Sequence, residues 1–312
     1  MFADMNAWDR QRRDYKQLKS YYYHLSSDGW KDGLLFHTKE HYAFGMTLIG
    51  LLTVMFGIVI FEFTLMPNHI HILMKGNGEQ CVKAFDYFRR KLSALLVHDG
   101  YPPLPEDYRF KLTPIDTEEQ MRVNILYVAR NPYEKGLAVP GGYPWGTAYL
   151  HYSILTSFLH GKEAGQMTHR ERYERTRTRT PIPPSWEWHP KLGLLPLSFI
   201  DHELFFRLFP TPKHYETRLV KDYEAFVKLG KSLDETVFFS ENEMIEIVQA
   251  SVRDLYPGKR KEALSPEEKG RLCVELSKTY QLSSGQMAEA LNMSEYLVKQ
   301  FLYAKDFGKQ RL

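Results

Sequence analysis

The chain has 312 residues, of which 43% are hydrophobic, 25% charged and 14% aromatic, with a formal net charge of +3 at pH 7. This is a globular composition, and the length suffices for one large core or two ordinary ones. Only two cysteines, Cys81 and Cys273, are present, which excludes a disulfide-stapled scaffold and any zinc site that needs several cysteines. The small positive charge permits a nucleic-acid partner without requiring one. Residues 1–19 mix Asp, Arg and Lys, so we expect no signal peptide and a cytoplasmic protein.

One uncharged stretch, residues 43–61, is long enough to span a membrane. Three glycines interrupt this stretch, and its last residues are β-branched. The alternative is a buried helix over 40–56, a break at Gly57 and a central strand over 58–65, because strands covered on both faces are continuously hydrophobic. We predict this second arrangement and no membrane partner.

Hydrophobic periodicity and turn residues predict the other elements of the first half. We predict strands over 21–25, 58–65, 69–75 and 108–114, helices over 40–56 and 79–97, and a helix that begins at Thr117 and ends at Pro132. The order is thus strand, helix, strand, strand, helix, strand, helix. This is the ferredoxin-like β-α-β-β-α-β pattern with one added helix, so the predicted fold class is α+β.

The composition changes after residue 160. Five arginines between 170 and 179 alternate with Thr and Glu, and three prolines lie between 181 and 184. This segment is either a solvated charged linker or an arm that contacts phosphates. The chain beyond residue 194 has helical patterning. We therefore predict an α+β domain over 1–155, an Arg/Pro-rich linker over 156–194 and a helical domain over 195–312.

The spacing near the C-terminus predicts a helix-turn-helix over about 282–304. Ser283 would cap its first helix, Asn292 would lie in the turn, and Ser294 would cap its second helix. The alternative is a helical hairpin that serves only packing or dimerisation. If the motif binds DNA, the exposed face of its second helix offers four side chains to a groove, namely Glu295, Tyr296, Lys299 and Gln300, of which the last three are the expected DNA contacts.

Two small groups of residues could carry chemistry. His69 and His71 are two apart on a predicted strand, so both rings project from one face, either to chelate a divalent metal or simply as part of a polar sheet face. Tyr127 and Asn131 are four apart on a predicted helix and share one side of it. A tyrosine can be a covalent nucleophile, although helix tyrosines usually only pack. Asn131 precedes Pro132 and is either a ligand of Mg²⁺ or Mn²⁺ or a cap of the helix end.

Taken together, these residues resemble a known family. Residues 65–74, LMPNHIHILM, resemble the histidine–hydrophobe–histidine strand of the HUH single-strand DNA transposases. Residues 127–132, YVARNP, with KGL at 135–137, resemble the catalytic-tyrosine helix of the single-tyrosine branch, and YPW at 143–145 resembles the tail of that domain. In this order and spacing, the chain is similar to a REP-associated tyrosine transposase over residues 20–152. It departs from many relatives around that helix end and after the YPW motif.

The resemblance implies an enzyme of DNA transposition and recombination, a transposase and HUH endonuclease that cuts and rejoins single-stranded DNA beside hairpins such as REP hairpins. Tyr127 is its implied nucleophile, which leaves a 5′-phosphotyrosine link and a free 3′-hydroxyl. The implied ligands of Mg²⁺ or Mn²⁺ are His69, His71 and Asn131, and the metal would polarise the scissile phosphate. Family members are commonly dimers, and the tyrosine acts either within its own subunit or across the dimer.

We expect phosphate contacts from four basic side chains, namely Arg89, Arg90, Lys91 and Arg130. The aromatic residues 21–23 could stack on unpaired bases. Three other functions stay open: a catalytically silent protein that binds hairpins or its own promoter, a membrane protein, and a replication initiator of the HUH class. Intact His69, His71 and Tyr127 favour the enzyme, because a pure binding protein does not need them.

Overall fold

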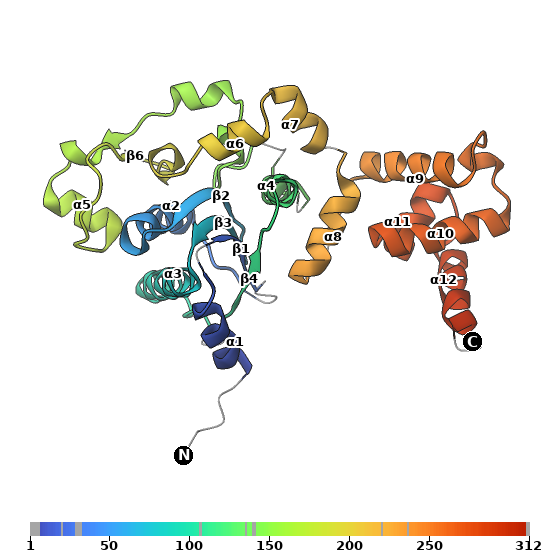
Figure 1. The fold of residues 1–312 in the computed structure, drawn as a ribbon, viewed down its shortest axis with the longest axis horizontal. Coiled ribbons are helices and arrows are strands. Elements are labelled where there is room, and N and C mark those ends of the chain that lie inside the picture. Colours follow the sequence, from blue (N-terminus) through green and yellow to red (C-terminus); the bar gives the residue numbers. More distant parts are fainter. Residues whose placement is uncertain are drawn as a thin grey trace, which may run out of the picture. The chain divides into compact units, whose positions relative to one another are not determined.

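The computed structural model describes residues 7–19, 21–28, 33–105, 108–134, 136–138, 142–219, 221–235 and 237–309. The chain divides into two compact units, Met1–Leu219 and Val220–Leu312 (Figure 1). Sheets and helices form the first unit, whereas the described part of the second unit contains helices only. The predicted α+β class is therefore confirmed.

The first unit is built on a four-stranded antiparallel sheet with the order β2-β3-β1-β4. Its first elements are α1 (Ala7–Lys16), β1 (Tyr21–Ser27), α2 (Lys39–Phe56), β2 (Val59–Leu65), β3 (Ile70–Gly76), α3 (Gly78–His98), β4 (Phe110–Pro114) and α4 (Glu118–Glu134). The predicted order of strands and helices is thus found, with α1 as an additional helix in front. Gly57 ends α2 in the left-handed conformation at φ 65°, which is the break expected before β2.

One face of this sheet carries the apolar core, under α2 and α3 (Figure 1). Alternate residues of the strands, among them Leu25 and Ile72, point into it together with the fully buried Met46 and Leu48 of α2. The uncharged stretch 43–61 is therefore a buried helix followed by a central strand, as predicted. Within the described ranges, no helix combines the length and the apolar character needed to cross a membrane.

The opposite face of the same sheet is polar, although it is also buried. Thr64, His71 and Ser26 lie side by side in one row across β2, β3 and β1, and the next row holds Glu62 and His24. All five side chains are buried. Helix α4 lies against β2 and β3 and covers this face (Figure 1).

Helix α4 continues beyond its predicted end. Pro132 lies inside the helix, in its last turn, where the loss of one helical N–H affects a single hydrogen bond. The chain then turns back, with Gly136 N donating to the carbonyl of Tyr133 and Leu137 N to that of Pro132, both at 2.9 Å. The prediction that the helix ends at Pro132 is wrong, because the helix continues to Glu134 and Asn131 lies inside it. Lys135 of the predicted motif lies outside the described residues.

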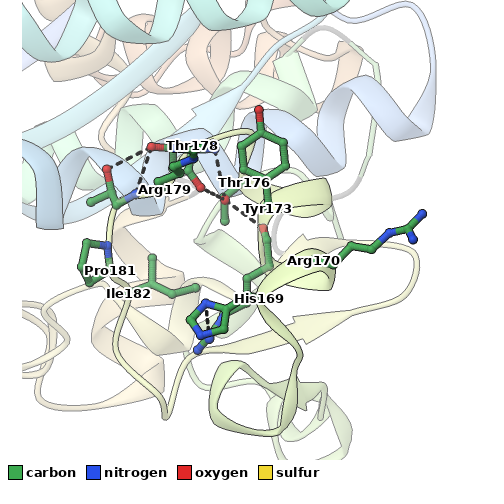
Figure 2. A pocket seen from close by; sticks show the side chains of 10 residues that line it. His169, Arg170, Tyr173, Thr176, Thr178, Arg179, Pro181 and Ile182 are labelled. Carbon is green, nitrogen blue, oxygen red and sulfur yellow. Dashed lines mark hydrogen bonds between the residues drawn. The ribbon is translucent and has the colours of Figure 1, made fainter.

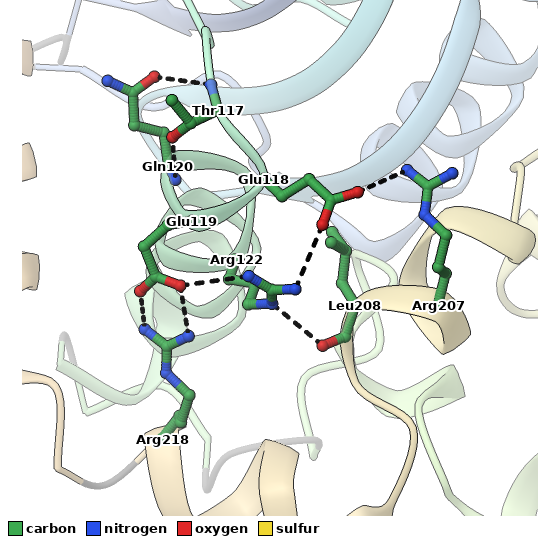
Figure 3. A network of polar contacts seen from close by, with 8 residues as sticks. All are labelled: Thr117, Glu118, Glu119, Gln120, Arg122, Arg207, Leu208 and Arg218. Atoms are coloured by element: carbon green, nitrogen blue, oxygen red, sulfur yellow. Dashed lines mark hydrogen bonds and ion pairs between the residues drawn. The ribbon is translucent and has the colours of Figure 1, made fainter.

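Ion pairs tie the first turn of α4 to α6 (Glu203–Leu208) and α7 (Pro212–Leu219), as Figure 3 shows. Arg218 of α7 forms a two-pronged contact with Glu119, which lowers the pKa of that carboxyl group. Glu118 pairs with Arg207 of α6 at 3.3 Å, and Arg122 bridges both glutamates. Both carboxylates are well exposed, so these contacts fix the position of α4 more than they stabilise the fold.

The segment predicted as a linker, 156–194, contains regular structure. Its neighbourhood holds η1 (Ala148–Leu150), η2 (Ile154–Phe158), β5 (Lys162–Glu163), η3 (Ala164–Gln166), α5 (His169–Thr176), β6 (Glu187–His189), β7 (Gly193–Leu194) and η4 (Pro196–Ser198). Strands β5, β6 and β7 form a small sheet around Trp186 and Trp188. Trp188 Nε1 donates to Thr47 Oγ1 of α2 at 3.2 Å. The two buried tryptophans therefore anchor an otherwise charged segment to the core of the first unit.

The second unit consists of α8 (Tyr223–Leu233), α9 (Glu241–Leu255), η5 (Lys261–Ala263), α10 (Pro266–Tyr280), α11 (Ser284–Leu291) and α12 (Glu295–Lys309). Serines with reciprocal side-chain bonds begin α9, α10 and α11, as the predicted cap at Ser283 required. The unit begins at Val220 rather than at residue 195, because α6 and α7 pack in the first unit. The division of the chain into three functional domains stays a prediction.

The close approach of α1 to α3 gives a test of the fold. Gly78 N donates to the carbonyl of Leu18, and a Cβ at Gly78 would lie 1.6 Å from the carbonyl oxygen of Tyr15. We expect Gly78→Ala to displace the end of α1 and to cost about 1–3 kcal/mol. Hydrogen exchange of the α1 amides should speed up accordingly. In the control Gly285→Ala no atom lies closer than 4.0 Å, so stability should stay level or rise slightly. Unchanged exchange in Gly78→Ala would contradict the close approach.

Candidate active site

Helix α4 places a stripe of polar side chains on the buried polar face of the sheet. Asn124, Tyr127 and Asn131 are spaced three and four residues apart, so they lie on one side of the helix, and all three are buried. The ring of Tyr127 lies 5.8 Å from that of His71, at 89°, and 6.3 Å from that of His24. The structure therefore brings together the two groups that the sequence singled out separately.

A chain of hydrogen bonds fixes the protons of two histidines. Asn124 Nδ2 donates to the carbonyl of Gln120 at 2.7 Å, so its Oδ1 is left to accept from His24 Nδ1, also at 2.7 Å. Nε2 of neutral His24 is then an acceptor, and it lies 3.0 Å from Nδ1 of His71. His71 Nδ1 therefore carries a proton, and Nε2 of the neutral ring keeps its lone pair. This lone pair accepts a hydrogen bond from Asn131 Nδ2 at 3.2 Å.

The other histidine of the predicted pair, His69, lies just before β3. The ring of His69 is perpendicular to that of His71, with centroids 4.9 Å apart. His69 Nδ1 donates to Asn68 Oδ1 at 2.7 Å, so Nε2 of the neutral ring carries the lone pair here too. Each histidine has a ligand nitrogen within 4.8 Å of one on the other ring. The two rings can therefore offer nitrogen lone pairs to one common ion.

The amide of Asn131 supports a metal at this place. Its Oδ1 is buried, and within the described ranges it has no hydrogen-bond partner. A buried acceptor without a partner costs about 1–3 kcal/mol unless something else binds it. Two imidazole nitrogens and one amide oxygen are a donor set that suits a divalent cation with open coordination positions. His69 and His71 can therefore hold a divalent cation, whereas Asn131 as a third ligand and the choice of Mg²⁺ or Mn²⁺ stay predictions.

A further polar pair occupies the same sheet face. Glu62 Oε2 accepts from His151 Nε2 at 2.5 Å, and both side chains are buried. The ring of His151 stacks on Phe205 of α6, with centroids 3.6 Å apart. Burial lowers the pKa of neighbouring His202 and raises that of Tyr215 well above its usual value. This pair connects β2 with α6, and so helps α6 and α4 to close over the polar face.

The predicted DNA contacts of the first unit differ in exposure. Arg90 is exposed on α3, whereas Arg89 is half-buried, with its Nη1 3.4 Å from a backbone carbonyl. Lys91 is half-buried, and its Nζ donates at 2.8 Å to a carbonyl at the end of α5. Arg130 is fully buried, and its Nη1 donates to the carbonyl of Leu219 at 2.9 Å. Arg90 is thus the most accessible of the four, and Arg130 lies inside the unit, where it links α4 to α7.

The other predicted DNA contacts lie on α12 and β1. Tyr296 is 72% exposed on α12, and Lys299 and Gln300 are exposed beside it. On β1, Tyr21 is exposed, whereas Tyr23 belongs to the core and its hydroxyl donates to a backbone carbonyl. Base stacking by Tyr21 and DNA contacts by α12 stay predictions.

Sequence reasoning missed two residues of the site, His24 and Asn124. His24 was part of a predicted strand, and the alternation of that strand places it on the same face as Ser26. Asn124 precedes Tyr127 by three residues and Asn131 by seven, which is the spacing of one helix face. Polar residues at positions that the periodicity predicts to be buried were the signal that could have identified both.

The hydrogen-bonded chain gives a test that does not depend on any activity. His24→Leu leaves Asn124 Oδ1 and His71 Nδ1 without their partner in a buried place, so we expect the free energy of unfolding to fall by about 2–4 kcal/mol. Tyr21→Phe on the same strand removes only the exposed contact of its hydroxyl with the carbonyl of Asp116, so the free energy of unfolding should change by less than about 0.5 kcal/mol. If both variants were equally stable in denaturant unfolding, the hydrogen bonds that link Asn124, His24 and His71 would not hold these side chains in place.

Comparison of the sequence with protein-family models and with curated proteins finds no match. Among solved structures, the chain is similar to a REP-associated tyrosine transposase bound to a REP hairpin. The TM-score is 0.36 and the sequence identity 12%, and the likeness covers 48% of this chain and 84% of the other.

Proposed function

We propose that the chain is a metal-dependent transposase and endonuclease that cuts and rejoins single-stranded DNA beside hairpins. The observation that carries the proposal is the packing of Tyr127 against His71, whose Nε2 is an acceptor next to the Asn131 amide and could bind a metal in place of that hydrogen bond. A tyrosine that only packs in a core does not need two oriented histidines beside it. The resemblance of residues 65–74 and 127–132 to the HUH single-tyrosine transposases points to the same chemistry.

In this proposal His69, His71 and Asn131 hold Mg²⁺ or Mn²⁺. Bound there, the ion would polarise a phosphoryl oxygen of the scissile phosphate and orient that phosphate. His24 and Asn124 act from behind His71: they keep its Nδ1 protonated and its ring in place. Outer residues of this kind commonly change metal affinity or activity by about 10- to 100-fold when they are replaced.

Tyr127 is the proposed nucleophile. Its hydroxyl gives up a proton as its oxygen forms a bond to phosphorus, while the bond from phosphorus to the 3′ oxygen breaks and that oxygen takes up a proton. The products are a 5′-phosphotyrosine link and a free 3′-hydroxyl. Attack of a second 3′-hydroxyl on the same phosphorus reverses the step and rejoins the strands without ATP. A homodimer of the chain stays a prediction.

Covalent trapping tests this chemistry directly. Labelled single strands from the flanks of the gene, hairpins included, are incubated with protein and Mg²⁺ or Mn²⁺ and run on a denaturing gel. We expect a protein-linked band that is lost with a chelator and that falls at least about a thousandfold in Tyr127→Phe and in the His69→Ala, His71→Ala double variant. Tyr133→Phe, on the same helix, is the control that should keep the band.

Two results would count against the enzyme. A band that persists in Tyr127→Phe would assign the link to another residue. Strands that bind without any adduct in the wild type would favour the second candidate function, which is a DNA-binding protein without catalysis.

The geometry of α11 and α12 favours that second candidate. Asn292 adopts the left-handed conformation at φ 50°, and Met293 N donates to the carbonyl of Ala288 at 2.8 Å, so the chain turns sharply between the helices. Val298 is buried, whereas Tyr296 stands on the exposed side of α12. A short turn followed by a helix with one buried and one exposed face is the arrangement of a helix-turn-helix.

Binding to duplex stems tests this second candidate. In the Lys299→Ala, Gln300→Ala double variant, we expect the affinity for a hairpin stem to fall about tenfold, because both side chains are exposed on the helix that would enter the groove. Lys278→Ala on α10 removes an equally exposed lysine and serves as the control. Footprints in which the double variant protects the stem like the wild type would remove this assignment.

A further inference from the structure

A pocket of about 590 Å³ lies beside α5, on the side of the sheet that α2 and α3 cover (Figure 2). Helix α5 forms one wall, and residues 178–182, which run back past the helix, form the other. Its volume lies within the roughly 300–1,000 Å³ that is typical of ligand sites. The pocket is lined by His169, Arg170, Arg172, Tyr173, Thr176, Thr178, Arg179, Thr180, Pro181 and Ile182.

The lining is basic, and no acidic side chain takes part in it. The two glutamates of α5 are engaged elsewhere: Glu171 binds Lys162, which lowers its pKa to about 2, and Glu174 pairs with Arg170. Figure 2 shows Arg170 extending away from the other labelled side chains. Within the described ranges, neither Arg172 nor Arg179 has a carboxylate partner. Arg172 Nη2 lies 3.1 Å from His169 Nδ1, so an anion would be bound by the other N–H groups of Arg172 together with those of Arg179.

The wall opposite α5 is held in a fixed conformation by threonine hydroxyls. Thr176 Oγ1 donates to the carbonyl of Arg172 at 2.8 Å and accepts from Thr178 N at 3.3 Å, while Thr178 Oγ1 lies 3.0 Å from Thr180 Oγ1 (Figure 2). These bonds repeat at every second residue and hold residues 178–180 next to the end of the helix. Tyr173, which is 52% exposed, adds an aromatic ring to the lining. The pocket thus combines two arginines, an accessible ring and a fixed backbone.

We propose that this pocket binds one nucleotide unit of a single-stranded nucleic acid, with its phosphate on Arg172 and Arg179 and its base on Tyr173. Guanidinium groups match phosphate oxygens in pairs, and an aromatic ring accepts any base face, so this combination binds a strand without reading its sequence. An unpaired base fits because a base inside a duplex has no free face to offer.

Neighbouring contacts extend the site along α3. Lys91 Nζ donates to the carbonyl of Arg177 at 2.8 Å, so the basic part of α3 adjoins the segment that follows α5. Arg90 is exposed one residue before Lys91 and could bind the next phosphate. The sequence left two interpretations of the arginine-rich segment, a solvated charged linker and an arm that contacts phosphates. These contacts favour the second interpretation. Only the identity of the strand as DNA rests on the proposed function.

Fluorescence anisotropy with a labelled oligo(dT) strand over a salt series tests the pocket in the full chain. For the Arg172→Gln, Arg179→Gln double variant, we expect the Kd to rise roughly tenfold. The plot of log affinity against log salt should become shallower by about 0.7, which corresponds to the one phosphate that the two arginines share. Arg175→Gln with Arg177→Gln removes the same charge from exposed residues that do not line the pocket, and should leave both values close to wild type.

The ring is tested separately. Tyr173→Ala should weaken binding about 5- to 100-fold, whereas Tyr173→Phe should bind like the wild type, because stacking needs the ring and not the hydroxyl. Superimposable thermal unfolding curves of all variants would show that the changes act on binding.

Several outcomes would overturn the proposal. Equal binding by the pocket variant and its control would remove the site. If inorganic phosphate or thymidine monophosphate competed as effectively as the strand, the pocket would be a site for free anions. A loss of affinity confined to duplex DNA would remove the single-strand assignment.

Adduct formation by Tyr127 is measured in parallel at saturating DNA and should persist in the pocket variant. If the wild type forms no adduct at all, the proposed enzyme fails while the binding result still decides on the pocket.

Discussion

The hydrogen bond between His24 and His71, buried on the polar face of the central sheet, sets the conditions for much of the first unit. A buried imidazole whose nitrogen finds no partner costs about 1–3 kcal/mol, so whatever covers these rings must also satisfy them. An apolar helix could not do this. Helix α4 can, because Asn124 accepts from one ring and Asn131 faces the other. The polar face thus selects the helix that covers it, and that helix carries Tyr127.

The same strands serve two very different faces because side chains alternate along them. Ile70 and Ile72 enter the core under α2 and α3, while His71 between them faces α4. A shift of one residue in register would bury the histidine among apolar side chains and expose the isoleucines to polar groups, so the apolar core enforces the register of the site. The ion pairs of Glu119 then fix the start of α4 from outside, where solvent keeps their own contribution to stability small.

Much of this arrangement could be predicted from local patterns. The strands, the break at Gly57 and the shared helix face of Tyr127 and Asn131 follow from periodicity and turn chemistry, which act over a few residues. The rest depends on tertiary contacts. The role of His24 depends on its 2.7 Å hydrogen bond to Asn124, which is one hundred residues away along the chain, so local patterns could not predict it.

Two further differences have the same origin. Pro132 is tolerated in α4 because it lies in the last turn of the helix. The residues that follow turn back, and their N–H groups donate to the last carbonyls of the helix. The charged segment around α5 folds because Trp186 and Trp188 bury their rings, a contribution that a count of its arginines and prolines hides. In both cases a few favourable contacts outweigh a local composition that argues against regular structure.

The candidate active site and the pocket beside α5 differ in the physics of their binding, and this difference suits a division of labour. The site around His71 is buried, and its hydrogen bonds hold the rings in one orientation, so it can position a bound group but exposes no charge to attract a distant one. The pocket offers two guanidinium groups near solvent, whose attraction for phosphates acts at a distance and weakens with salt. The sheet and its apolar core lie between the two places. Affinity for a strand can therefore be set at Arg172 and Arg179, while His24 and Asn124 separately hold the ring of His71, on which the proposed chemistry depends.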